Sequence, residues 1–423
     1  MLLRDHLLSH APNTRLVAVT VDHGLRVASA DEAAAVARRC AADGIEHRIL
    51  RWTDPKPAKG IPAAAREARY RLLAQAAREA GTDVVLTGHT ADDQAETVSM
   101  RMVRGDGPGL AGMAPATLYD GTVWLLRPLL GQRRSELREF LRGQGVSWVE
   151  DATNDDLRFE RPRVRARLAA RAGHRAPLAP SGEGEGEIGS RLALARKNAE
   201  RRLDIASRAA MLILDLAEQK APGLLHLDPS FARHRERDAA VHALRVLLAA
   251  VGGSEFLPPQ ERAEAMLARL AEPPFRGTLA RSLVAARGDG IWLARETRGL
   301  PGSQPVEDGA IWDGRFRLRV AKDVGGLRIA ARSVVEAQAT DSPVDGLPRS
   351  LVRAARSCQP VFLSAASEAL SGLPEGVSLA PVAAPYARFL PSFDLDLARA
   401  VNGLIGAPPI PAPPFQEHNE SKA

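Results

Sequence analysis

The sequence predicts an α/β protein in which a doubly wound, mostly parallel sheet is followed by a helical domain and a small α+β domain. Apolar runs of strand length alternate with amphipathic runs of helix length up to about residue 172, with short loops between them. A stretch rich in Pro, Gly and Glu interrupts this pattern at 176–190, and short β-like runs appear beyond Gly277. Strand–helix alternation with short loops implies right-handed crossovers, so we expect the strands of the first domain to be parallel.

The first domain contains five predicted elements before its most polar motif. Asp31 and Glu32 suit the positive end of a helix, while Pro62 and Gly81 suit a helix start and the position just beyond a helix end. In chain order the predicted elements are strand 16–21, helix 30–42, strand 47–52, helix 62–80 and strand 84–87. Much later, 290–295 and 316–320 are predicted strands.

Changes in composition divide the 423 residues into five segments. We expect an α/β domain at 1–172, a linker at 173–190, a helical domain at 191–275, a small α+β domain at 276–406 and a disordered tail at 407–423.

The composition also narrows the class of protein. No apolar stretch is long enough to span a bilayer, and the N-terminus lacks the pattern of a signal peptide. Cys40 and Cys358 lie far apart in the sequence and form no metal-binding cluster. We therefore expect a cytoplasmic protein in a reducing compartment, without a membrane partner and without a resident metal site.

Arginine is concentrated between residues 127 and 171, although the net charge of the chain is only +6. Guanidinium groups match phosphate oxygens, so a polyanionic partner is one interpretation, and ordinary solvated helices are the other. Arg161, Arg163 and Arg165 alternate, so an extended segment would direct all three the same way, which favours contact with an RNA backbone. Arg127, in the run Arg127–Leu130, either belongs to a structural turn or faces RNA or phosphate.

The run from Gly88 to Thr97 follows a predicted strand and opens a predicted helix, which places it at the carboxyl edge of a sheet, where ligands bind in open α/β folds. If the helical turn begins near Thr90, His89, Asp93 and Glu96 share one face. One imidazole and two carboxylates would suit acid–base or metal-assisted chemistry. The alternative is an acidic helix cap without further function.

Several segments of the first domain together resemble the tRNA(Ile)-lysidine synthetases of the PP-loop ATP pyrophosphatase superfamily. The matching segments, in the order of that family, are Val21–Arg26, Ala65–Tyr70, Gly88–Thr97, Arg104–Gly105, Gly109–Met113, Arg127–Leu130, Glu150–Asp155 and Arg161–Arg165. The resemblance covers nearly all of residues 15–170, and it implies an adenine nucleotide alpha hydrolase-like fold.

The resemblance also implies an activity. Such enzymes use ATP to adenylate the C2 oxygen of the wobble cytidine in a tRNA(Ile) with a CAU anticodon, and free L-lysine then displaces AMP to give lysidine. It implies ATP and Mg²⁺ as cofactors and leaves a homodimer as an expectation. By position, it assigns catalysis to His89, Asp93 and Glu96 and nucleotide binding to Val21, His23, Arg66 and Gly88. The alternatives are a plain turn at Asp22–Gly24 and, for Arg66 and Tyr70, which share a helix face, packing of the helix on the sheet. The clustering of arginines favours RNA binding by Arg127, Arg133, Arg161, Arg163 and Arg165.

One departure from the family pattern concerns the phosphate-binding loop. The sequence contains no Ser-Gly-Gly-x-Asp-Ser run after an apolar strand, so we expect the chain as written to lack this loop and the first strand of the sheet. A start codon placed too far downstream would explain this, and so would a non-catalytic tRNA-binding paralogue. In either case we expect little lysidine formation and a tendency to aggregate, because neighbouring strands lose a partner.

A second alternative is another PP-loop tRNA-modifying enzyme, such as a 2-thiocytidine synthetase, although the two cysteines form no Cys-x-x-Cys pair. The codons immediately upstream of Met1 discriminate between the explanations for the missing loop.

Overall fold

The computed structural model describes residues 7, 9–11, 13–25, 29–105, 107–146, 148, 158–173, 186–322, 324–335 and 346–414. The chain divides into two compact units. Unit 1 comprises Met1–Thr87, Thr122–Leu126 and Pro413–Ala423, and unit 2 comprises Gly88–Gly121 and Arg127–Ala412. Most of the predicted linker (174–185) and of the predicted tail (415–423) lies outside the described residues, and the predicted domain boundaries stay predictions.

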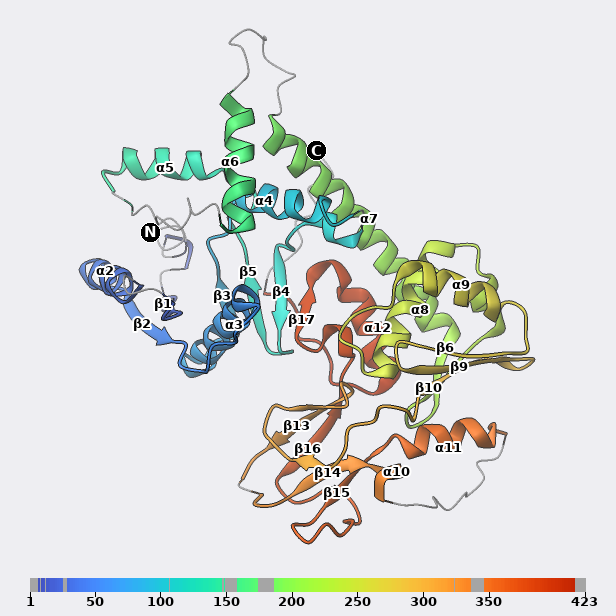
Figure 1. Cartoon of the computed structure of the whole chain (residues 1–423). Helices are drawn as coiled ribbons and strands as arrows, with labels where there is room; N and C mark the ends of the chain where they lie inside the picture. The colour runs from blue at the N-terminus through green and yellow to red at the C-terminus, as the bar shows by residue number, and fades with distance from the viewer. Residues whose placement is uncertain are drawn as a thin grey trace. The chain divides into compact units, whose positions relative to one another are not determined.

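Unit 1 contains parallel strand pairs with helices between the strands (Figure 1). Its elements are β1 (Val17–Asp22), α2 (Ser29–Ala42), β2 (Glu46–Arg51), α3 (Ile61–Glu79), β3 (Val84–Leu86) and β5 (Val123–Leu126). Strand β1 pairs in parallel with β2, and β3 pairs in parallel with β5. The five elements predicted for this part of the chain are confirmed to within two residues at each end.

Helix α3 covers strands β1 and β2 through a face of small and apolar side chains. Ala65, Ala68 and Leu72 recur at helical spacing and pack with Trp52, which follows β2. Val21, near the end of β1, packs against the same cluster. The core of unit 1 therefore fixes the carboxyl ends of β1 and β2, where the sequence places its candidate nucleotide-binding residues.

The first part of unit 2 is mainly helical. It contains α4 (Ala91–Met102), η1 (Pro108–Ala111), β4 (Ala116–Tyr119), α5 (Arg134–Gly143), α6 (Glu160–Gly173) and α7 (Glu187–Leu216). Helix α4 packs against α6 and α7, with Ala95, Val164 and Leu168 buried between them. This packing brings α6 alongside the acidic face of α4.

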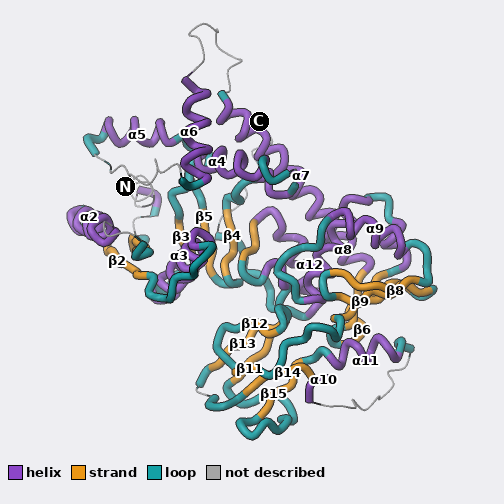
Figure 2. Tube along the Cα trace, in the orientation of Figure 1, coloured by secondary structure: helices purple, strands orange, loops and turns teal. Residues whose placement is uncertain are grey.

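The middle of unit 2 surrounds a buried helix. The elements are β6 (Ala217–Ala221), β7 (Leu224–Leu227), η3 (Pro229–Arg233), α8 (Arg237–Gly252), α9 (Gln260–Leu270), β8 (Phe275–Leu279), β9 (Ser282–Arg287) and β10 (Gly290–Arg295). The strands form one antiparallel sheet in the order β6-β7-β10-β9-β8. Figure 2 labels β6, β8 and β9 among them. The segment expected to be mostly helical thus also holds a β-hairpin, because Pro222 and Gly223 form a turn in which Gly223 has a φ of +74°.

The C-terminal part of unit 2 contains two three-stranded sheets, in the orders β11-β14-β15 and β12-β13-β16. Its elements are β11 (Gln304–Pro305), β12 (Ile311–Trp312), β13 (Phe316–Val320), β14 (Arg328–Ala331), α10 (Arg332–Val335), α11 (Arg349–Ser357), β15 (Pro360–Leu363), β16 (Val377–Pro381), η4 (Ala384–Tyr386), β17 (Phe389–Pro391), η5 (Ser392–Asp394) and α12 (Leu395–Ile405). The strands predicted at 290–295 and 316–320 are confirmed as β10 and β13.

Strand β17 pairs with β4, so a strand near the end of the chain completes one from the first 120 residues. Phe389 lies beside Tyr119, with their ring centroids 5.1 Å apart. Helix α12 then packs along α7. Within the described part of the chain, no helix combines the length and apolar character needed to cross a bilayer.

Candidate active site

The acidic helix α4 begins with a capping box. Thr90 is the N-cap residue, with an extended backbone (φ −112°, ψ 174°), and its hydroxyl accepts a hydrogen bond from the Asp93 N–H. In return, the Thr90 N–H and hydroxyl donate to Asp93 Oδ2, at 2.8 and 2.7 Å. Both ends of the box are therefore satisfied, and the Asp93 side chain is held in one orientation.

Asp93 forms the acidic helix cap that the sequence offered as one alternative, and its catalytic role stays a prediction. Its Oδ2 atom completes the helix cap, while Oδ1 faces two arginines, with Arg161 Nη2 at 3.1 Å and Arg134 Nη2 at 3.2 Å. Burial alone would raise the pKa of Asp93, but the Thr90 hydrogen bonds and the two arginine charges outweigh it and hold the pKa below its ordinary range. Asp93 is therefore a carboxylate at neutral pH.

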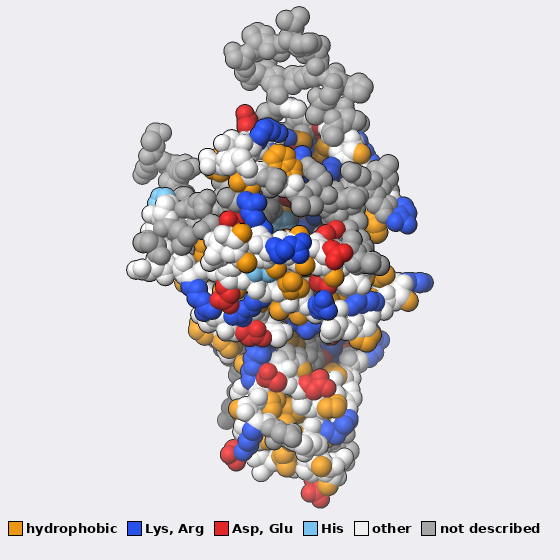
Figure 3. Space-filling model, turned by 90° about the vertical axis from the view of Figure 1, so that its left-hand side faces the viewer, with side chains coloured by type: hydrophobic (Ala, Val, Ile, Leu, Met, Phe, Trp, Pro, Cys, Tyr) orange, Lys and Arg blue, Asp and Glu red, His pale blue; other side chains and the backbone are white. Residues whose placement is uncertain are grey.

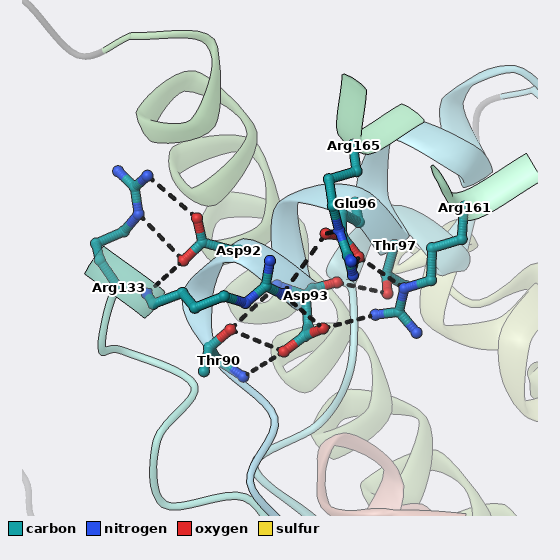
Figure 4. A network of polar contacts seen from close by, with 9 residues as sticks. Thr90, Asp92, Asp93, Glu96, Thr97, Arg133, Arg161 and Arg165 are labelled. Carbon is teal, nitrogen blue, oxygen red and sulfur yellow. Dashed lines mark hydrogen bonds and ion pairs between the residues drawn. The ribbon is translucent and has the colours of Figure 1, made fainter. Parts of the chain in front are cut away.

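Glu96 lies one helical turn after Asp93 and is almost completely buried, with 2% of its side chain exposed. Arg161 Nε approaches Glu96 Oε2 at 2.7 Å, and Arg165 Nε approaches Oε1 at 2.7 Å. Arg134 Nη2 lies 3.6 Å from Oε1. Figure 4 shows Arg161 and Arg165 directed toward the carboxylates of Asp93 and Glu96. A buried carboxylate requires such partners, because its desolvation is otherwise costly.

The prediction that Arg161, Arg163 and Arg165 lie on an extended segment is wrong. All three are on helix α6, where residues four apart share a face and the residue between them points elsewhere. Arg161 and Arg165 consequently turn toward α4 and pair with its carboxylates. Arg163 is exposed and donates to the Arg158 carbonyl at 2.9 Å. The prediction failed because arginines at every second position can occur in a short helical stretch as well as in an extended one.

Asp92 faces a different element from Asp93. Its Oδ2 accepts a hydrogen bond from the Arg134 backbone N–H at 2.6 Å, at the start of α5, and Arg133 Nη2 lies 3.2 Å from Oδ1. Burial opposes ionisation of Asp92, but the Arg134 N–H and the Arg133 guanidinium more than compensate, so its pKa lies below the ordinary range. Asp92 therefore connects the start of α4 to the start of α5.

The structure places His89 outside the helix. Because Thr90 is the N-cap, His89 precedes it, so it does not share a helical face with Asp93 and Glu96. Its side chain is partly buried, and its catalytic role stays a prediction. Before it, Gly88 is exposed, and a Cβ atom at this position would meet no described atom within 4 Å.

In unit 1, strand β1 ends in a tight turn. Gly24 has a φ of +60° and donates its N–H to Asp22 Oδ1 at 2.9 Å, and Ser29 Oγ donates to the same atom at 2.7 Å. These hydrogen bonds, first that of Ser29, lower the pKa of the buried Asp22. Asp22–Gly24 is thus a hydrogen-bonded turn, which fixes the backbone of His23 and leaves its nucleotide-binding role a prediction.

His23 is held between β2 and α3. Its ring meets Trp52 edge-on, with centroids 6.3 Å apart, and Arg69 Nη2 lies 2.9 Å from Nε2. Burial, reinforced by the Arg69 charge, lowers the pKa of His23, so the ring is neutral at pH 7. Its Nδ1 atom is buried and has no hydrogen-bond partner among the described residues. That atom is available to a polar group of a ligand.

Arg66 and Tyr70 share a face of α3, as predicted from their spacing. The Arg66 guanidinium lies over the Tyr70 ring, 4.9 Å from its centroid, while Tyr70 is buried. Arg66 is exposed and can reach a ligand in solvent, and Val21 packs its side chain into the core. A contact from Val21 to a nucleotide would therefore come from its backbone.

The remaining candidates for RNA binding differ in accessibility. Arg127 is 5% exposed and donates to the Ala114 carbonyl at 2.8 Å and to Thr117 Oγ1 at 2.9 Å, which favours the structural-turn alternative. Arg133 and Arg163 are reachable from solvent. On the face in Figure 3, basic side chains are interspersed with acidic ones rather than gathered in one patch.

The donor set suits a cationic substrate better than a resident metal. Among the described residues, no group of three or more His, Cys, Asp or Glu side chains is arranged to hold a metal ion. Asp93 and Glu96 instead present oxygen atoms to guanidinium groups, which are organic cations. The same oxygens can bind the ammonium group of an amine.

Sequence reasoning missed two members of this cluster and the function of a third. Thr90 and Asp93 follow the Ser/Thr-x-x-Glu-type pattern of a capping box, which was a usable signal. Arg134 had no signal, because its position depends on how α5 packs. The predicted acidic helix cap did not single out Asp92, which accepts a hydrogen bond from the first N–H of the next helix.

The sequence of the chain matches known proteins. A PP-loop domain model matches residues 1–172. The chain is 47% identical over 431 residues to the tRNA(Ile)-lysidine synthase of Mesorhizobium japonicum, covering 99% of this chain and 92% of that protein. It is 38% identical to the enzyme of Rhizobium meliloti (95% and 87% covered) and 39% identical to that of Brucella melitensis biotype 2 (74% and 69% covered).

Proposed function

Because the chain belongs to the tRNA(Ile)-lysidine synthase family, we propose that it converts the wobble cytidine of a tRNA(Ile) with a CAU anticodon to lysidine, using ATP and free L-lysine. The observation that carries the proposal is the 47% identity over 99% of the chain. The Asp93–Glu96 pair supports it, since two ionised side chains on one helix face suit an amine substrate.

The proposed reaction has two steps. The C2 oxygen of the cytidine attacks the α-phosphorus of ATP, and pyrophosphate leaves. The lysine side-chain amine then attacks C2, the C2–oxygen bond breaks, AMP leaves, and the amine loses a proton to a base. We assign Asp93 and Glu96 to binding an amino group of lysine and His89 to proton transfer, since an imidazole titrates near neutral pH.

The residues present fit the adenine side of ATP. The turn Asp22–Gly24 fixes the backbone of Val21 and His23, and the buried Nδ1 atom of His23 has no hydrogen-bond partner among the described residues. Arg66 is exposed on α3, and Gly88 leaves open space beside its backbone. We propose that Mg²⁺ arrives with the ATP phosphates, because the described residues hold no ready-made metal cluster.

For the RNA, we propose that Arg133 and Arg163 contact phosphates from the surface, and that Arg161 and Arg165 do so only after leaving the carboxylates. A homodimer stays a prediction, which light scattering can test. A cytoplasmic location also stays a prediction, which cell fractionation can test. The expected absence of a Ser-Gly-Gly-x-Asp-Ser phosphate-binding loop also stays a prediction.

Incorporation of radiolabelled lysine into a tRNA(Ile) transcript tests the function. We expect label that requires ATP and is lost when the wobble cytidine of the transcript is replaced by uridine. The assay is run on the 423-residue chain and on a chain extended by any in-frame upstream codons. Label in the extended form alone would support the expected absence of the loop. Failure of both forms, each folded and able to bind the transcript, would favour the non-catalytic alternative.

A further inference from the structure

Two fixed carboxylates on α4 are paired with cations that are only loosely fixed. Asp93 is held by the Thr90 capping box, and Glu96 is buried. Their partners Arg134, Arg161 and Arg165 are long side chains that reach in from solvent, with 27–38% of each side chain exposed. The anionic site is therefore preorganised, whereas its present cations can exchange.

The charges leave no room for a further cation. Asp93 and Glu96 supply two negative charges, and the three arginines that contact them supply three positive charges. An added ammonium would be repelled, since like charges at such distances disfavour each other strongly in a partly buried site. A lysine amine can bind these oxygens only when an arginine leaves.

Arg161 is the arginine whose position conflicts most directly with such a substrate. It bridges both carboxylates, with Nη2 3.1 Å from Asp93 Oδ1 and Nε 2.7 Å from Glu96 Oε2. Arg165 contacts Glu96 alone, so it can neutralise that buried group after Arg161 has moved. Removal of Arg161 would therefore open one contact position on each carboxylate, while Arg134 still faces Asp93 and Arg165 still pairs with Glu96.

A phosphate group is a suitable alternative partner for a displaced guanidinium. Arginine binds phosphate oxygens through two parallel hydrogen bonds, and Arg161 lies in the first turn of α6, two residues from the exposed Arg163. A backbone that contacts this turn can therefore recruit both side chains.

Resting on the proposed function, we propose that Arg161 occupies the lysine-binding site until tRNA is bound, and that a phosphate of the tRNA then draws it away. Binding of tRNA creates the site for the lysine amine, and lysine must raise tRNA affinity by the same factor. The exchange delays lysine binding until the nucleotide to be modified is present.

The test measures lysine binding directly, by equilibrium dialysis of labelled lysine against the full chain, with and without tRNA(Ile) transcript. We expect tRNA to tighten lysine binding by about tenfold, within the usual range of such couplings. Arg161→Gln should bind lysine without tRNA about as tightly as the unmodified protein does with it. Arg262→Gln removes the same charge from an exposed position on α9 and should keep the coupling.

A folding control and a second variant keep the test decisive. Thermal melting identifies any variant that does not fold, and Arg161→Lys, which retains a cation, should still show weak lysine binding without tRNA. Unchanged lysine affinity in a folded Arg161→Gln protein would overturn the inference, as would equal coupling in both glutamine variants. Absence of any lysine binding with tRNA present, together with no lysidine formation, would instead overturn the proposed function.

Discussion

The backbone N–H of Arg134 lies 2.6 Å from Asp92 Oδ2, so a side chain in the first turn of helix α4 caps helix α5. The two helices that surround the candidate site are thereby held at their N-terminal ends by one carboxylate. Arg133 adds a second contact to the same carboxylate, at 3.2 Å.

Replacing Asp92 with Ala should loosen the start of α5. Loss of a capping carboxylate usually costs about 1 kcal/mol, and here the Arg134 N–H loses its acceptor. Urea denaturation should show the decrease. Asp92→Asn keeps an acceptor oxygen and should recover most of the stability; equal losses in the two variants would argue against a capping role.

Replacing Asp93 with Asn should abolish lysine transfer while tRNA binding stays nearly intact. The amide oxygen can still accept the Thr90 hydrogen bonds, so the helix cap survives, but the charge that faces Arg161 and Arg134 is lost. Lysine incorporation and filter binding of tRNA measure the two effects. Normal turnover by this variant would exclude the assigned role.

Replacing Arg127 with Ala should destabilise the protein and leave the RNA affinity of the folded form unchanged. Two hydrogen bonds from a charged donor to buried oxygens of Ala114 and Thr117 are lost, at a cost of about 2–4 kcal/mol. Urea denaturation measures this loss. Arg163→Ala, which replaces an exposed arginine, is the matched control and should change stability little. Weaker tRNA binding by a stably folded Arg127→Ala protein would instead indicate that Arg127 contacts RNA.

Replacing Arg163 with Ala should weaken tRNA binding and reduce its salt dependence. Loss of one phosphate contact lowers the slope of log Kd against log salt concentration by about one. Exposed Arg262 on α9 provides a control with the same charge change. A combined change of Arg161, Arg163 and Arg165 should weaken binding further, but it also removes two partners of Glu96. An unchanged slope for the Arg163 variant would indicate that Arg163 is a solvated surface residue that does not contact the tRNA.

His242 should make unit 2 less stable in mild acid. Burial lowers its pKa to about 4 in the folded protein, against about 6.5 when unfolded, so the unfolded chain binds more protons between these values. Titration of His242 therefore leaves the free energy of unfolding unchanged above pH 6.5. It lowers that free energy by about 3 kcal/mol in total as the pH falls toward 4. The free energy of unfolding against pH measures it. His242→Gln should show a flatter curve, and parallel curves would contradict the assignment.

Local sequence signals predicted much of unit 1 and part of the site. Pro62 and Gly81 marked the ends of α3, and the spacing of Arg66 and Tyr70 predicted that they share one face of this helix. The paired arginines were not predictable in the same way. Arg161 and Arg134 reach the carboxylates only because α5 and α6 pack beside α4, and no short-range pattern encodes that packing. His89 was misplaced because the exact N-cap depends on the local backbone at Thr90.

The pairing of β17 with β4 has a consequence for how the protein is made. Leu390 lies opposite Leu118, yet about two thirds of the chain must be synthesised between the two. During synthesis on the ribosome, this edge of β4 stays unpaired until β17 has been made, when synthesis is almost complete. Stalled or prematurely terminated chains would therefore expose that edge, and quality-control proteases and chaperones would encounter it before the finished enzyme could form.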